Sequence, residues 1–96
     1  DIPMDFSAIQ EEIQGQAKEQ LDKLCATFSV SESNRHLVTG RPESEIPTQA
    51  KVVACDLIVV GSHARWGLAL LLGSTTDGVM HGAECDVLAV KVDAGL

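Results

Sequence analysis

The fold is decided by the segment DLIVVGSHAR at residues 56–65. Its apolar residues at 57–60 follow one another without alternation, which is typical of a parallel strand that is covered on both faces. Gly61 comes directly after this run and allows the chain to leave the strand sharply. Because ligands of open parallel sheets bind beyond the carboxyl ends of the strands, residues 61–65 are the expected place for binding chemistry.

Helical and extended segments alternate on both sides of this central strand. Apolar residues at three- and four-residue steps predict a helix over residues 8–28, with Ser7 as its N-cap. The other predicted elements are a strand at 36–39, a helix from about Glu43 or Ser44, a helix at 75–82 and a strand at 86–92. This alternation indicates βα units in a single α/β domain, residues 1–96, with a mainly parallel, twisted sheet and helices on both faces.

Composition excludes several classes of partner. Fourteen acidic residues against seven basic ones give a net charge of -7, which repels the phosphates of nucleic acids and anionic lipid surfaces. No apolar run approaches the roughly 18 residues of a membrane span, and the N-terminus has no basic segment followed by an apolar one. We therefore expect a cytoplasmic protein that binds neither nucleic acid nor membranes.

The three cysteines do not predict a metal centre or a disulfide framework. Cys25, Cys55 and Cys85 are 30 residues apart and belong to no cluster with the spacing of a zinc site. Each is expected to be a small core residue, and a reactive thiol is the alternative. We therefore expect no resident metal site.

A second glycine-hydroxyl segment, GSTTD at residues 73–77, begins the helix at 75–82. Unpaired backbone N–H groups point outward at a helix start and attract anions, so this segment could bind phosphate. The alternative is that Ser74 and Asp77 are only a capping pair. Physical reasoning from the residues leaves both possibilities open.

The segment DLIVVGSHARWGLALLLGSTTDGVMHGAECDVLAVKV, residues 56–92, resembles the C-terminal part of the universal stress protein family. The similarity covers roughly residues 35–92. In the nucleotide-binding branch of that family, a Gly is followed by two residues, a second Gly, nine residues, and then Gly with Ser or Thr. Gly61 matches the first position and Gly73-Ser74 the last. Ala64 replaces the second glycine, and the spacer of residues 65–72 has eight residues instead of nine.

The resemblance implies a Rossmann-like fold of the adenine nucleotide alpha hydrolase type. It implies a stress-responsive regulatory domain that binds ATP together with Mg²⁺ and forms a homodimer through the strand at 86–92. Slow ATP hydrolysis is the most that is expected of it, because no residue supplies a base or a Walker-type lysine. The residues that the resemblance assigns to the nucleotide are Gly61, Ser62, Ala64, Arg65, Gly73, Ser74 and Thr75.

The family domain begins with a strand, a helix and a second strand that have no counterpart here, so the chain resembles a domain truncated at its N-terminus. In the family's strand order, 3-2-1-4-5, the two absent strands separate the strand at 35–39 from the one at 57–61. We therefore expect the strand at 57–61 to pair, within its own chain, only with the strand at 86–92.

Two other functions compete with nucleotide binding. One is an interaction and dimerisation module of the same fold without a ligand, which is suggested by Ala64 and the shortened spacer. The other is a thiol redox sensor that uses Cys55 or Cys85. Near the central strand, His63 is expected to be a polar loop residue, and Trp66 is expected to pack in a short buried turn.

Overall fold

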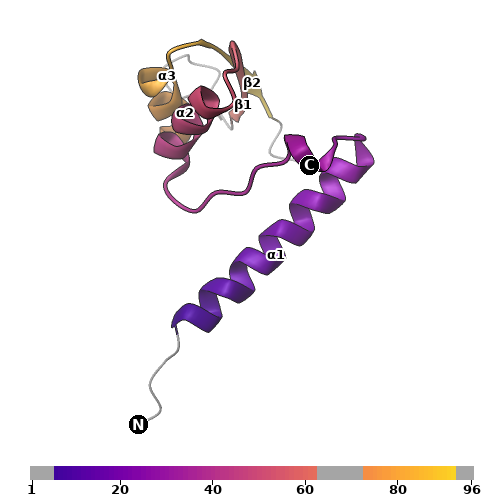
Figure 1. The fold of residues 1–96 in the computed structure, drawn as a ribbon. Coiled ribbons are helices and arrows are strands. Elements are labelled where there is room, and N and C mark those ends of the chain that lie inside the picture. Colours follow the sequence, from indigo (N-terminus) through magenta and orange to yellow (C-terminus); the bar gives the residue numbers. More distant parts are fainter. Residues whose placement is uncertain (1–5, 63–72, 93–96) are drawn as a thin grey trace. The chain divides into compact units, whose positions relative to one another are not determined.

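The computed structural model describes residues 6–62 and 73–92 (Figure 1). Contacts divide the chain into two compact units, Asp1–Val38 and Thr39–Leu96. Within the described ranges, no helix has the length and apolar content that a membrane crossing requires. That residues 1–96 form one domain stays a prediction.

The first unit contains the long helix α1, Phe6–Thr27, which confirms the helix predicted over 8–28. Ser7 lies inside this helix and not at its cap. The helix ends in a Schellman motif: Ser29 has a φ of 56°, and the Val30 N–H donates to the Cys25 carbonyl at 2.8 Å. None of the residues in α1 is buried. A short 3₁₀ helix, η1, Glu32–Asn34, follows.

The strand predicted at 36–39 is not formed in the part of the chain that the structure describes. Arg35, just before it, has an extended backbone with φ -107° and ψ 127°. A β-strand, however, is defined by ladder hydrogen bonds to a neighbouring strand, and the described sheet contains only two other strands. A sequence that favours extended backbone is therefore not sufficient to form a strand at 36–39.

The second unit begins with α2, Pro42–Val52, where Pro42 occupies the first helical turn. This start is one residue earlier than the predicted Glu43. Pro47 lies inside the helix and is buried. The helix also ends in a Schellman motif: Ala54 has a φ of 55°, and the Cys55 N–H donates to the Ala50 carbonyl at 3.0 Å.

The sheet consists of two parallel strands, β1, Leu57–Ser62, and β2, Asp86–Lys91, which are joined by α3, Ser74–Gly82. Val59 pairs with Leu88, and Ser62 pairs with Lys91. The predicted pairing of the central strand with the last strand is therefore confirmed, as is the helix between them. Helix α2 packs against α3, and α3 contacts both strands.

Helices α2 and α3 approach each other closely because α3 carries two glycines. A Cβ atom at Gly78 would lie 2.5 Å from the Glu43 Cβ, and one at Gly82 would lie 3.2 Å from the Pro47 Cγ. Val79, on the same helix, is completely buried. The core of this unit therefore lies where α3 meets α2 and the strands.

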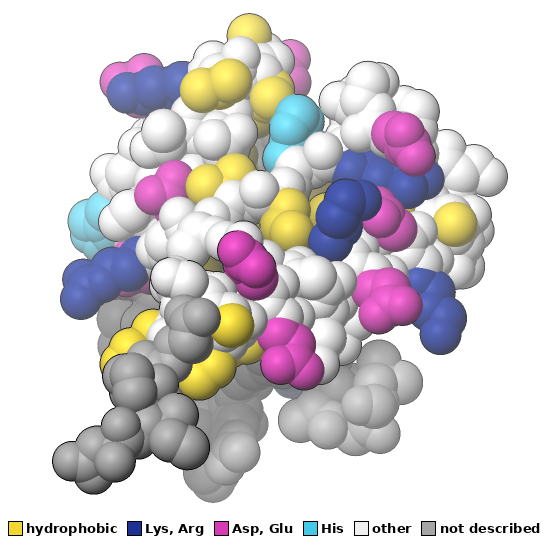
Figure 2. Space-filling model, turned by 60° about the horizontal axis from the view of Figure 1, so that its bottom comes forward, with side chains coloured by type: hydrophobic (Ala, Val, Ile, Leu, Met, Phe, Trp, Pro, Cys, Tyr) yellow, Lys and Arg dark blue, Asp and Glu magenta, His cyan; other side chains and the backbone are white. Residues whose placement is uncertain are grey.

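Within the second unit, the described helices pack toward one face of the two strands, and helices on both faces stay a prediction. Ile58 and Ser62 are buried on one face, and the alternate residues of both strands are exposed. A connection between two parallel strands through one helix places that helix on one side of the pair. Figure 2 shows acidic and basic side chains interspersed over one face of the molecule, with apolar side chains reaching the surface between them. The exposed apolar strand residues are Leu57, Val59, Leu88 and Val90.

Candidate functional site

The carboxyl end of β1 is formed by Gly61 and Ser62. Gly61 lies within the strand, opposite Val90, so it does not serve as the sharp exit that the sequence suggested. A Cβ atom at Gly61 would lie 3.0 Å from the Val92 Cγ2. A larger residue at this position would therefore require the Val92 side chain to shift by a few tenths of an ångström. Ser62 is buried, and its carbonyl accepts a 2.8 Å hydrogen bond from the Val92 N–H.

The start of α3 is formed by Gly73, Ser74 and Thr75. Gly73 is the N-cap and has φ 87° and ψ 153°, a conformation that favours glycine. Its carbonyl accepts a 3.0 Å hydrogen bond from the Asp77 N–H. Ser74 is exposed and Thr75 is half-buried.

The capping-pair alternative for Ser74 and Asp77 does not fit this geometry. The N-cap is Gly73, which has no side chain to cap the helix. Asp77 instead faces His81, whose Nδ1 lies 3.6 Å from the Asp77 Oδ1 and 2.8 Å from the Asp77 carbonyl oxygen. The first N–H groups of the helix have no intrahelical acceptor, and among the described residues no N-cap side chain bonds them.

Thr76 connects the two parts of the candidate site. It is 2% exposed, and its Oγ1 donates a hydrogen bond to the Gly61 carbonyl at 3.4 Å. This contact brings the start of α3 to the carboxyl end of β1. Sequence reasoning did not assign this role to Thr76, although Thr76 and Val79 are three residues apart and share the buried face of the helix.

The remaining predicted residues of this site lie outside the described residues. These are Ala64 and Arg65, together with His63 and Trp66. The described part of the site is therefore the end of β1 and the start of α3.

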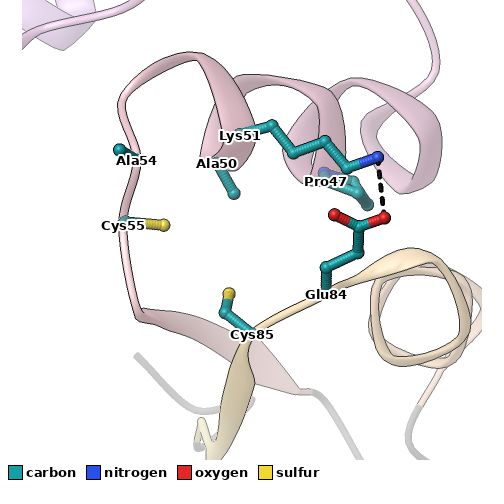
Figure 3. A pocket seen from close by; sticks show the side chains of 7 residues that line it. All are labelled: Pro47, Ala50, Lys51, Ala54, Cys55, Glu84 and Cys85. Carbon is teal, nitrogen blue, oxygen red and sulfur yellow. Dashed lines mark ion pairs between the residues drawn. The ribbon is translucent and has the colours of Figure 1, made fainter.

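A second site lies at the opposite, amino-terminal end of the two strands (Figure 3). A pocket of about 280 Å³ is lined by Pro47, Ala50, Lys51, Ala54, Cys55, Glu84 and Cys85. The Cys55 and Cys85 side chains both point into it, from the end of α2 and from the start of β2. Lys51 and Glu84 form an ion pair across the pocket, with 3.1 Å between Nζ and Oε1.

The Cys85 thiol is perturbed by this environment. Burial raises its pKa above the usual range, and the charge of a Cys55 thiolate and a hydrogen bond with Cys55 raise it further. Asp86 and Asp56 act in the same direction. Cys85 is therefore a half-buried residue that lines a pocket, and its thiol is held in the protonated form.

The first unit has its own pocket, of about 350 Å³, beside the end of α1. Arg35 organises it: Nη1 lies 3.2 Å from the Asp22 Oδ1, and Nε and Nη2 donate to the Val30 carbonyl. Lys18 also pairs with Asp22, at 2.6 Å. Hydrogen bonds from Lys18 and Arg35 hold the pKa of Asp22 below its usual range, although partial desolvation acts against them.

Across residues 6–62 and 73–92, no group of three or more His, Cys, Asp or Glu side chains could hold a metal ion.

Comparison with known proteins extends the similarity beyond the region that the sequence motifs indicated. The model of the universal stress protein family matches residues 2–91, which include α1. Universal stress protein A homolog 2 of Coxiella burnetii is 43% identical over 77 residues, which are 80% of this chain and 53% of that protein. Homolog 1 of the same organism is 37% identical over 89 residues, 93% of this chain and 61% of the relative.

Longer relatives match as well. Universal stress protein E of Salmonella typhi is 34% identical over 90 residues, 93% of this chain and 29% of that protein. The chain thus spans roughly half to three fifths of the A-type relatives and less than a third of the E-type relative. Because the family model covers nearly all of it, the chain belongs to the universal stress protein family.

Proposed function

We propose that this chain is part of a stress-responsive regulatory domain that binds an adenine nucleotide, ATP, and dimerises. The observation that carries the nucleotide proposal is the hydrogen bond of Thr76 to the Gly61 carbonyl, which brings the start of α3 to the carboxyl end of β1. The outward N–H groups of a helix start favour phosphate, and the carboxyl ends of parallel strands are where such ligands bind. The phosphates would lie on the N–H groups of Gly73, Ser74 and Thr75, with Mg²⁺ accompanying them.

The backbone at Gly73 supports this proposal. Its φ of 87° disfavours any residue with a side chain, yet a Cβ atom there would meet no described atom within 4 Å. The glycine is therefore required by the backbone conformation and not by packing within the described chain. Such a conformation turns the N–H groups at the helix start outward without a side chain between them and an anion. Ala64 and Arg65, which the family resemblance also assigns to the nucleotide, lie outside the described residues.

A charge reversal tests the phosphate site without threatening the fold. Ser74→Asp places a carboxylate at the first position of α3, where it favours the helix dipole but repels phosphate. Ser44→Asp is the matched control, since Ser44 is also exposed in the first turn of a helix, α2. We expect Ser74→Asp to weaken ATP binding at least about tenfold in calorimetric titration, because one unit of like charge adjoins the phosphates. The control should bind as the parent does.

The titration is run on this chain and on a version extended at its N-terminus by the first strand, helix and strand of a relative. If the extended chain binds ATP and Ser74→Asp does not weaken that binding, the phosphates lie elsewhere. If neither chain binds ATP, the ligand-free interaction module is the better description. Gly73→Val should also abolish binding, through strain at its positive φ.

The dimer is proposed to form through the edge of β2 that faces away from β1, which no other described strand pairs with. The N–H of Val92 donates toward β1, and N–H groups alternate in direction along a strand, so those of Val87, Ala89 and Lys91 point to the other edge. An exposed edge of this kind favours antiparallel pairing with a second copy across a two-fold axis. The apolar side chains of Leu88 and Val90 are partly exposed beside that edge.

Proline substitution distinguishes this edge from the ladder inside the chain. Ala89→Pro removes a donor from the outer edge and should convert a dimer to a monomer in sedimentation experiments, with the circular dichroism spectrum retained. Val90→Pro removes a donor that faces β1 and should instead destabilise the fold. A dimer that persists in the Ala89→Pro variant would rule out this interface.

A further inference from the structure

The amino-terminal end of the sheet brings two cysteines to one pocket by two independent local features. Cys55 is placed by the Schellman motif that ends α2, in which its N–H bonds the Ala50 carbonyl at 3.0 Å. Cys85 directly precedes β2, and the next residue, Asp86, pairs with Leu57. Since neighbouring strands are about 4.8 Å apart, this register holds the two chain segments side by side.

The two thiols also interact with each other. Both side chains point into the pocket in Figure 3, and a hydrogen bond with Cys55 contributes to the raised pKa of Cys85. Neighbouring strand segments, about 4.8 Å apart, fall within the range of Cα–Cα separations at which disulfides occur. By contrast, Cys25 lies on α1, in the first unit.

Small molecules can reach this pair from solvent. Cys55 and Cys85 are each partly exposed, and the side chains of the Lys51–Glu84 ion pair across the pocket are 58% and 70% exposed. Exposed ion pairs contribute little to stability, so this one is a weak barrier to a small reagent. The remaining lining, Pro47, Ala50 and Ala54, carries no side-chain polar group.

We propose that Cys55 and Cys85 are a dithiol modification site that a small disulfide compound oxidises to an intramolecular disulfide. The thiolate of Cys55 attacks one sulfur of the small disulfide, forms a mixed disulfide and expels one small thiolate. Cys85 then loses its proton, attacks the Cys55 sulfur and expels the second small thiolate. In total, two protein thiols are oxidised, one disulfide bond is exchanged for another, and two small thiols are released.

The raised pKa of Cys85 determines the order of these steps. A protonated thiol is a poor nucleophile, so Cys85 acts second, when the mixed disulfide on Cys55 is already beside it. The product joins the end of α2 to the start of β2. It closes a loop that contains β1 and α3, so it restricts the motion of the segment between Cys55 and Cys85.

The experiment uses oxidised glutathione on the 96-residue chain. Trypsin cuts after Lys23, Arg35, Lys51, Arg65 and Lys91, which places each cysteine in a separate peptide. Cys25 lies in 24–35, Cys55 in 52–65 and Cys85 in 66–91. After digestion without reduction, we expect a linked pair of peptides 52–65 and 66–91 in mass spectrometry.

Serine variants and dilution supply the controls. Cys25→Ser should retain the linked pair. Cys85→Ser should retain a mixed disulfide with glutathione on Cys55, whereas Cys55→Ser should react much more slowly, because the Cys85 thiol is held in the protonated form. The Cys55–Cys85 link should exceed any link to Cys25 at least about tenfold and should not decrease on dilution, because the reaction is intramolecular. The proposal is overturned if Cys55 and Cys85 both end as glutathione mixed disulfides, or if the link forms only between molecules.

Discussion

Helices α1 and α3 differ in what keeps them helical. Helix α1 has 22 residues, none of them buried, whereas α3 has nine residues that include two glycines and the fully buried Val79. A helix shorter than about 12 residues is marginal by itself in water, and each internal glycine costs about 1 kcal/mol relative to alanine. Helix α1 can therefore rely on its own sequence, but α3 depends on packing against α2 and the strands.

The comparison predicts the largest effect for truncating the core side chain of α3. Val79→Ala should lower the free energy of unfolding by about 1.5–3 kcal/mol, since Val79 is fully buried. Ile13→Ala, at a position of α1 that is 60% exposed, should change it by less than about 0.5 kcal/mol. Urea denaturation followed by circular dichroism measures both. Equal losses in the two variants would show that α1 also depends on burial.

Replacing a glycine by alanine should lower the stability in α3 and raise it in α1. Gly78→Ala should destabilise by about 1–3 kcal/mol, because the new Cβ would lie 2.5 Å from the Glu43 Cβ. Gly15→Ala meets nothing within 4 Å and should increase the helical content of α1, with a gain of about 0.5–1 kcal/mol. A stabilising Gly78→Ala would mean that α2 and α3 do not approach so closely.

A substitution that acts only on the local backbone should change the stability of both units in the same way. Ser29 and Ala54 both end a helix with a positive φ, near 55°, that glycine adopts without strain. Ser29→Gly and Ala54→Gly should each stabilise by about 0.5–1 kcal/mol, because they relieve this strain. Thermal unfolding of the single and double variants tests this. A loss of stability in either variant would contradict the assigned backbone.

The smallest expected effect is a pH dependence within the first unit. Because Lys18 and Arg35 lower the pKa of Asp22, this carboxylate stabilises the unit at pH values above its ordinary pKa. The stabilisation is lost as the pH falls through the lowered value in the folded state. The helical signal of the parent should therefore decrease on acidification more than that of Asp22→Asn. Identical acid titrations of the two chains would show that the pair has no energetic role.

Most elements of secondary structure were predictable because their signals are local. The three- and four-residue apolar steps of α1 and the unbroken apolar run of β1 are properties of a few adjacent residues, and both elements form as predicted. The strand expected at 36–39 failed because a strand also needs a partner, which no local pattern contains. Which face of the strand pair α3 contacts likewise depended on where this helix packs.

For the candidate site, the residue types and their positions along the chain were determined by the sequence alone. It placed Gly61 at the carboxyl end of a parallel strand and Gly73-Ser74-Thr75 at a helix start, because glycines and hydroxyls act on the backbone next to them. Tertiary structure decided that Gly61 makes room for Val92, that Thr76 joins the helix to the strand, and that Cys55 and Cys85 share a pocket. These contacts join residues 15 to 31 positions apart, and only the folded chain brings such residues together.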